Sequence, residues 1–198
     1  MNLAEVVPAL LKASTHVAGV ELRGSRGRGD DGPFSDWDFV VWTDDVAAIS
    51  TELPALVQPL RPMLMFWDPL SEVPCFQLML SGPTKVDFIF EGRTFPVQPP
   101  WTLTEVTLPS IDAHFWDWIL WLTSKTHAGK METVTSELQK MFGYLLAPMG
   151  GQAPPSSLDD AVEQYLRLRT SAELRYGVVV DPEPGRQVIE VVARLSAG

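Results

Sequence analysis

The feature that most limits how this chain can fold is the stretch "SDWDFVVW", residues 35–42, in which two aspartates alternate with aromatic residues before an apolar run. Side chains two residues apart on a strand point to the same face, so Asp36 and Asp38 project together while Trp37 and Phe39 point to the other face. Such alternation is also typical of an ordinary half-exposed strand. The surrounding segments must therefore decide what the pair does.

The segment before the pair adds a glycine turn. Gly24-Ser25 lies where an apolar strand-like segment ends. A glycine there lets the backbone approach a ligand closely, and the serine hydroxyl with nearby amides can hold phosphate oxygens. Arg26, together with Arg23 and Arg28, brings positive charge to the same loop.

A third acid follows on a later segment. Asp87 stands between Val86 and Phe88 in "TKVDFIF", so its side chain faces away from both apolar neighbours. Neighbouring carboxylates repel each other unless a cation lies between them. A hard divalent ion such as Mg²⁺ takes oxygen ligands and keeps positions open for substrate phosphates. These residues indicate a candidate metal site.

In this order, the segments resemble the signature of the polymerase-β-type nucleotidyltransferases. The resemblance covers "LRGSRGRGDDGPFSDWDFVVW", residues 22–42, and the strand "KVDFIF", residues 85–90. It is closest to the small bacterial antibiotic nucleotidyltransferases of the aminoglycoside and lincosamide type, which pair this domain with a C-terminal helical domain. The chain departs from them in two ways: the spacer contains extra acids, and the chain is short for an antibiotic-modifying member.

The resemblance implies a reaction and a role for each motif residue. A hydroxyl of an acceptor attacks the α-phosphorus of a nucleoside triphosphate, with ATP favoured, and pyrophosphate leaves. Asp36 and Asp38 would bind one or two Mg²⁺ ions, and Asp87 would complete the metal site or accept the hydroxyl proton. The residues implied in nucleotide binding are Gly24, Ser25, Arg26, Ser35 and Lys125. In the helical region, further candidates are Lys130 for phosphate and Glu132 and Glu137 as acids.

The apolar pattern predicts an α+β fold. A nucleotidyltransferase-type mixed sheet with flanking helices is expected over residues 1–97, and a helical subdomain over 110–198, joined by a proline- and threonine-rich segment. Pro54 should bend the helix over 43–58 or start it afresh. Gly82-Pro83 predicts an antiparallel hairpin. Strands are expected at 16–25, 36–42, 61–67, 75–81 and 84–92, and further helices at 3–15, 112–127, 129–146, 156–175 and 185–195.

The charge and composition of the chain limit the classes of molecule that it is expected to bind. The formal net charge of −10 argues against a nucleic acid, because such binding depends on clustered Lys and Arg. A cationic small-molecule acceptor, such as an aminoglycoside, fits the charge better. The apolar runs are too short to span a membrane, and the N-terminus lacks the pattern of a secretory signal, so a cytoplasmic protein is expected. The single Cys75 reads as a small buried hydrophobe, and the oligomeric state stays open between monomer and homodimer.

Two other functions remain open. The chain could modify a protein, as antitoxin-type adenylyltransferases of similar fold do, or it could be a non-catalytic domain that binds nucleotide or a partner. The helical cluster Trp116, Trp118 and Trp121 is expected to form helix core or a subunit interface. Asp30-Asp31 are hypothesised to attract a polycationic acceptor, and the three histidines are expected to be structural or solvent-facing.

Overall fold

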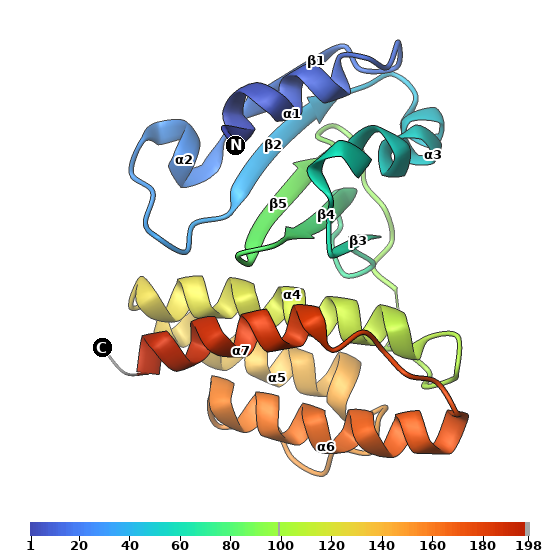
Figure 1. Cartoon of the computed structure of the whole chain (residues 1–198), viewed down its shortest axis with the longest axis vertical. Helices are drawn as coiled ribbons and strands as arrows, with labels where there is room; N and C mark the ends of the chain where they lie inside the picture. Colours follow the sequence, from blue (N-terminus) through green and yellow to red (C-terminus); the bar gives the residue numbers. More distant parts are fainter. Residues whose placement is uncertain (99, 197–198) are drawn as a thin grey trace. The chain divides into compact units, whose positions relative to one another are not determined.

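The structure, a computed structural model, describes residues 1–98 and 100–196 and divides the chain into two compact units, Met1–Gln98 and Pro99–Gly198 (Figure 1). The first unit combines a mixed sheet with helices, and the second is helical. The predicted α+β fold, a mixed sheet with flanking helices followed by C-terminal helices, is confirmed.

The sheet of the first unit has the strand order β1-β2-β5-β4-β3. Only the pair formed by β2 (Trp37–Trp42) and β5 (Thr84–Ile89) is parallel within this described sheet; the other neighbours are antiparallel. The remaining strands are β1 (Gly19–Leu22), β3 (Leu64–Trp67) and β4 (Cys75–Leu80). The predicted hairpin at Gly82 is confirmed, because β4 pairs with β5 in antiparallel register around a glycine with φ +107°.

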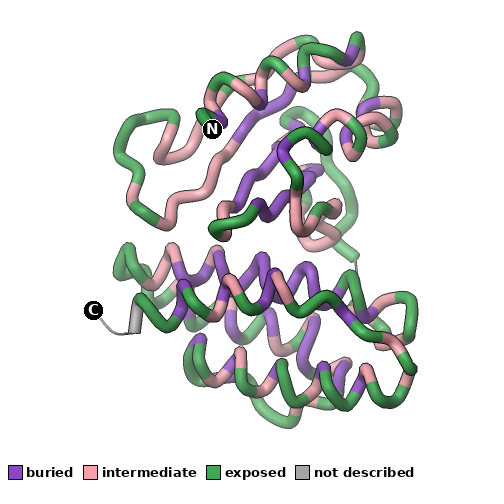
Figure 2. Tube along the Cα trace, viewed as in Figure 1, coloured by how far each residue is buried: buried purple, intermediate pink, exposed green. Residues whose placement is uncertain are grey.

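Two helices pack on one face of this sheet (Figure 1). α1 (Leu3–Leu11) and α3 (Val46–Val57) each contribute an apolar stripe, and the sheet contributes alternate residues of its strands. Figure 2 shows buried residues along β2 and β5. Full burial of a large apolar side chain stabilises the folded state by about 1.5–3 kcal/mol. The apolar contacts between the sheet and the two helices therefore determine which face of each strand turns inward. Its fully buried members include Leu11, Phe39, Ile49, Leu53, Val86 and Phe88.

Of the two alternatives expected at Pro54, a bend in the helix or a new start, the structure excludes the new start. α3 runs without a break from Val46 to Val57 with Pro54 inside it, and a short 3-10 turn, η1 (Gln58–Leu60), follows. Ile49, Leu53 and Val57 are buried at helical spacing on both sides of the proline. Tertiary packing of this stripe compensates for the backbone hydrogen bond that proline cannot donate.

The second unit is built around α4 (Leu108–His127). It contacts α5 (Met131–Met141), α6 (Leu158–Tyr176) and α7 (Glu183–Ser196). α5 continues into a π-helical segment, η2 (Phe142–Leu146), and α6 is capped at its N-terminus by Ser157, whose hydroxyl accepts a hydrogen bond from the Asp160 amide. Of the helices in the described chain, none combines the length and apolar character that crossing a bilayer requires.

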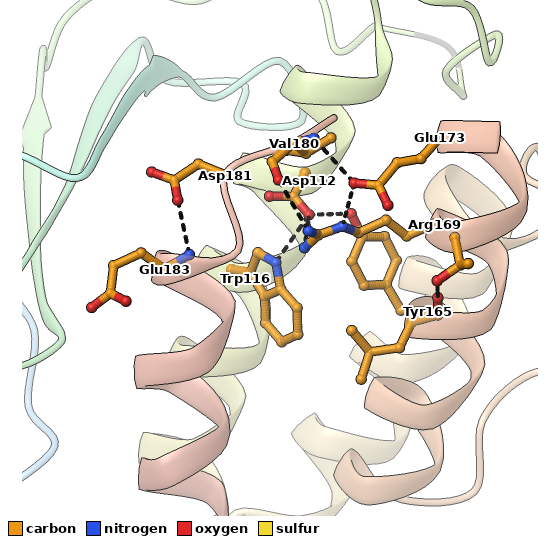
Figure 3. A network of polar contacts seen from close by, with 10 residues as sticks. Asp112, Trp116, Tyr165, Arg169, Glu173, Val180, Asp181 and Glu183 are labelled. Carbon is orange, nitrogen blue, oxygen red and sulfur yellow. Dashed lines mark hydrogen bonds and ion pairs between the residues drawn. The ribbon is translucent and has the colours of Figure 1, made fainter. Parts of the chain in front are cut away.

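A buried polar network centred on Asp112 joins these helices (Figure 3). Oδ1 of Asp112 accepts hydrogen bonds from Trp116 Nε1 at 3.0 Å, the Tyr165 hydroxyl at 2.6 Å and Arg169 Nη1 at 3.2 Å. Arg169 also donates to Glu173 at 3.1 Å and to the carbonyl of Val180, also at 3.1 Å. The network therefore ties α4 to α6 and to the segment that leads into α7. Burial raises the pKa of Asp112 above its usual range.

We expect Asp112→Ala to destabilise the chain by about 3–5 kcal/mol, because it removes one of the two carboxylates that pair with the buried Arg169 and leaves the Tyr165 hydroxyl and the Trp116 Nε1 group without their acceptor. Asp112→Asn keeps a carbonyl acceptor for the same donors and should cost only about 1–2 kcal/mol. Urea unfolding followed by circular dichroism measures both losses. Equal losses for the two variants would show that the acceptor oxygen does not hold the network.

The same comparison should depend on pH. The pKa of Asp112 is raised on folding, so its contribution to stability is fully present below its ordinary value of 3.8 and is lost as pH rises through the folded value. The amide side chain in Asp112→Asn does not titrate. The stability difference between wild type and this variant should therefore shift in favour of the variant as pH rises above 3.8. A pH-independent difference would contradict the raised pKa.

Candidate functional site

The register of the parallel strands brings two of the predicted acids together. Asp38 on β2 is the direct partner of Asp87 on β5, and Gln77 on β4 is the next residue across the sheet. Partner residues on neighbouring strands lie about 5 Å apart, on one face. Phe39 and Phe88 are partners one position later and point into the core beneath the helices. The acids consequently share the face opposite to α1 and α3.

Asp36 lies one residue before β2. If the register is extended by one pair from Trp37 and Val86, Asp36 stands opposite Lys85. The alternation of an extended chain then gives Asp36, Asp38, Lys85 and Asp87 the same face of the sheet.

The glycine of the predicted phosphate loop lies directly against Asp38. The Arg23 amide donates a hydrogen bond of 2.8 Å to the Asp38 carbonyl, and Gly24 follows with φ +64°. A Cβ built on Gly24 would overlap Oδ2 of Asp38. Glycine is therefore required at this position for two reasons: its backbone is left-handed, and the Asp38 carboxylate occupies the space that a Cβ would need.

Arg26 and Ser35 hold the loop that leads into β2. Arg26 belongs to the short helix α2 (Gly24–Arg28), and its guanidinium donates to the Ser35 carbonyl from Nε at 3.0 Å and from Nη2 at 2.8 Å. It also lies 4.4 Å from the ring centre of Trp37. The Ser35 hydroxyl accepts from the Gly32 amide at 2.9 Å. Both residues position the backbone next to Asp36, and their expected role in binding nucleotide stays a prediction.

The extra acids of the spacer are paired within their own loop. Asp31 lies 2.8 Å from Arg26 Nη1, and Asp30 lies 3.2 Å from Arg28 Nε. These partners offset the negative charge that the acids were expected to offer to a polycationic acceptor, although exposed pairs of this kind are weak.

Lys85 is a charged residue of this face that was not predicted to belong to the site. Its Nζ lies 2.9 Å from Oδ1 of Asp87, and the two side chains are 3% and 12% exposed. Oδ1 makes no hydrogen bond with favourable geometry within the described chain, so the two groups meet as an ion pair. The spacing Lys-x-Asp on a strand could have revealed the pair, because residues two apart share a face.

Asp68, which follows β3, belongs to the same electrostatic surroundings. Burial raises its pKa; the negative charge of Asp87 adds to this effect and the positive charge of Lys85 opposes it. The backbone amide of Leu70 donates to its Oδ1 at 2.8 Å. Asp68 was also not predicted, since nothing in its local sequence distinguishes it from a loop acid.

The acids fit a metal site only in part. Among residues 1–98 and 100–196, no three histidine, cysteine, aspartate or glutamate side chains lie together as a metal ion would need. Magnesium is, however, usually held by one or two carboxylates, with substrate phosphates and waters as its other ligands. The oxygen donors and the cradle at Gly24 fit such a substrate-completed site. Metal binding by Asp36, Asp38 and Asp87 stays a prediction.

Two of the candidates in the helical unit, Lys125 and Glu137, have side-chain contacts within that unit. Lys125 Nζ lies 4.8 Å from the ring centre of Trp121. Glu137 accepts hydrogen bonds from Trp118 Nε1 at 3.2 Å and from Lys140 at 2.6 Å. Trp116 is fully buried, which confirms its expected place in the helix core. The nucleotide-related roles expected of Lys125, Lys130, Glu132 and Glu137 stay predictions.

No protein-family model matches the chain, and no curated protein sequence does. Solved structures do match. A cytoplasmic RNA terminal U-transferase is 16% identical in sequence, with a TM-score of 0.40; the match covers 72% of this chain and 43% of the U-transferase chain. The polymerase core of TRAMP, an RNA surveillance complex, is 13% identical, covering 95% of this chain and 55% of its own, with a TM-score of 0.42.

An aminoglycoside 6-adenyltransferase from Bacillus subtilis is 10% identical, covering 97% of this chain and 96% of its own, with a TM-score of 0.35. The chain thus spans about half the length of the first two proteins, at 43% and 55%. All three are nucleotidyltransferases, the class that the sequence motif resembles. TM-scores this low describe only a loose likeness in the course of the chain.

The contact between Gly24 and Asp38 can be tested with two alanine variants. Gly24→Ala and Gly29→Ala both place a side chain at positive φ, +64° and +75°, and should each cost about 1–2 kcal/mol of stability. Only Gly24→Ala collides with Asp38, because a Cβ at Gly29 meets nothing within 4 Å. We expect Gly24→Ala to weaken binding of ATP with Mg²⁺ by roughly tenfold or more in calorimetric titration. Gly29→Ala should bind as wild type does, and equal weakening in both variants would show that backbone strain alone matters.

Proposed function

We propose that this chain is a Mg²⁺-dependent nucleotidyltransferase that transfers AMP from ATP to a hydroxyl of a small cationic molecule, with an aminoglycoside-type acceptor favoured. The observation that carries the proposal is that three motif segments, the Gly24 turn and the strands that bear Asp38 and Asp87, lie next to one another. The Gly24 turn rests on the carboxylate of Asp38, and Asp38 is paired across parallel strands with Asp87. A solitary Gly-Ser dipeptide or a solitary Asp-x-Asp would not support this function.

Each residue group has a distinct task in the proposed reaction. The amides and hydroxyl at Gly24-Ser25 hold the triphosphate, and Asp36 with Asp38 hold Mg²⁺ beside it. When bound, Mg²⁺ offsets charge that develops on the phosphate oxygens. The acceptor oxygen forms a bond to the α-phosphorus as the bond from that phosphorus to the bridging oxygen breaks, and pyrophosphate leaves. Asp87 takes the proton of the acceptor hydroxyl or helps to hold the metal.

The acceptor is inferred from charge. A chain with a net charge of −10 attracts a polyamine and repels a polynucleotide. The named relatives include enzymes of RNA as well as an aminoglycoside 6-adenyltransferase. Charge favours the small cationic acceptor over RNA. We further propose that the protein acts in the cytoplasm, where ATP is available and where the buried thiol of Cys75 stays reduced.

The ion pair between Lys85 and Asp87 favours a second candidate function. Asp87 is already neutralised by a side chain of the same strand, and within the described chain no group of three acids is assembled for a metal. Those features suit a domain that binds a nucleotide without transferring it. A protein acceptor is also compatible with the proposed chemistry.

Pyrophosphate release from ATP with Mg²⁺, measured across a panel of aminoglycosides and lincosamides, tests the proposal. We expect release with at least one acceptor, and a loss on the order of 100-fold or more in Asp38→Asn. Asp44→Asn, an exposed acid beyond the end of β2, is the matched control and should keep full activity. Turnover that survives in Asp38→Asn would exclude the metal mechanism. ATP binding without release would favour the non-catalytic function, and transfer of labelled AMP to protein alone would identify a protein acceptor.

A further inference from the structure

The acidic face of the sheet carries its own cation. We propose that Lys85 acts as a counter-ion to Asp87 and thereby lowers the affinity of the site for a divalent ion in the absence of nucleotide. The inference rests on the proposed function, since it concerns the metal site of that reaction. Lys85 acts through Asp87 and is therefore a positioning residue.

The geometry places the ammonium group of Lys85 on the same face of the sheet as the carboxylates of Asp36, Asp38 and Asp87. Asp38 and Asp87 are direct partners across β2 and β5, and extending the register by one pair sets Asp36 opposite Lys85. Lys85 precedes Asp87 by two residues on the same strand and reaches it at 2.9 Å. Neighbouring carboxylates repel each other unless a cation lies between them. Here the ammonium group of Lys85 provides part of that positive charge, so the acids depend less on a metal ion.

The pair differs from an ordinary surface salt bridge. The Lys85 side chain is only 3% exposed and that of Asp87 12%, so water screens the pair far less than it would at the surface. The charge of Lys85 also reaches Asp68, where it opposes the rise in pKa caused by burial. Removing one member of such a buried pair leaves the other charge uncompensated in a low-dielectric environment, which is unfavourable.

Lys85 and a metal ion compete for the same oxygen. Oδ1 of Asp87 is the atom that lies against Nζ of Lys85, so the positive charge of the lysine opposes the approach of a second cation to this oxygen. While the lysine stays there, its charge weakens the contribution of Asp87, and the other two carboxylates of the motif, Asp36 and Asp38, already take part in interactions of their own. The remaining ligands must be phosphate oxygens and waters, as is usual for Mg²⁺. The chain alone would therefore hold the ion weakly, and a bound triphosphate would supply the ligands that complete its site.

Direct binding of Mn²⁺ at one fixed pH, followed by its electron paramagnetic resonance signal without nucleotide, tests this inference. We expect Lys85→Gln to bind Mn²⁺ at least tenfold more tightly than wild type, because the competing charge is gone and Asp87 becomes available. Lys85→Arg keeps the charge and should retain the weak wild-type affinity. Adding Asp87→Asn to Lys85→Gln should cancel most of the gain. Thermal unfolding of each variant verifies that it is folded.

The outcomes separate this inference from the proposed function. If wild type and Lys85→Gln bind Mn²⁺ equally and Asp38→Asn abolishes binding, the metal site stands and the role of Lys85 is overturned. If no variant binds Mn²⁺, with ATP or without it, both proposals fail. Should Lys85→Gln not fold, Lys85→Met gives the same comparison, since it keeps an unbranched stem beside the strand partner Met79. Tight Mn²⁺ binding by wild type without nucleotide would also overturn the inference.

Discussion

The parallel pairing of β2 with β5 is the constraint on which the first unit depends. It sets Phe39 against Phe88 on the core face, with ring centres 6.2 Å apart, and in the same register it sets Asp38 against Asp87 on the other face. A slip of one residue would exchange the faces and turn the carboxylates toward the apolar layer of α1 and α3. The hydrophobic effect that holds the core thus also fixes the position of the acids.

The chemistry of the site depends on features outside the strands. The left-handed turn at Gly24 fits against the Asp38 carboxylate, and Arg26 fixes the loop backbone at Ser35. Arg26 shows how a residue read as a phosphate ligand can be engaged by its own loop, through two bonds to one carbonyl and a contact with Trp37. Positive charge near a phosphate motif is therefore weak evidence for phosphate binding.

Both units bury charge, and they compensate for it in different ways. On the sheet, Lys85 is paired with Asp87 in a contact that lacks hydrogen-bond geometry. In the helical unit, Asp112 accepts three hydrogen bonds through a single oxygen, and Arg169 satisfies neighbouring groups as well. The saturated network of Asp112 suits a fixed structural role, as Figure 3 illustrates. On the sheet, the contact between Lys85 and Asp87 is an ion pair, and the charge of Lys85 also acts on Asp68.

The local periodicities and the order of the motifs could be predicted from the amino-acid sequence. The alternation around Asp36 and Asp38 indicated which residues share a face, Gly82 indicated the hairpin, and the serines before α6 indicated its beginning, because these signals depend on nearest neighbours along the chain. Three features became clear only from the folded chain: Asp38 is paired with Asp87, Lys85 lies beside Asp87, and α3 continues through Pro54. Those outcomes depend on strand register and on packing between segments distant in sequence, which no local pattern encodes.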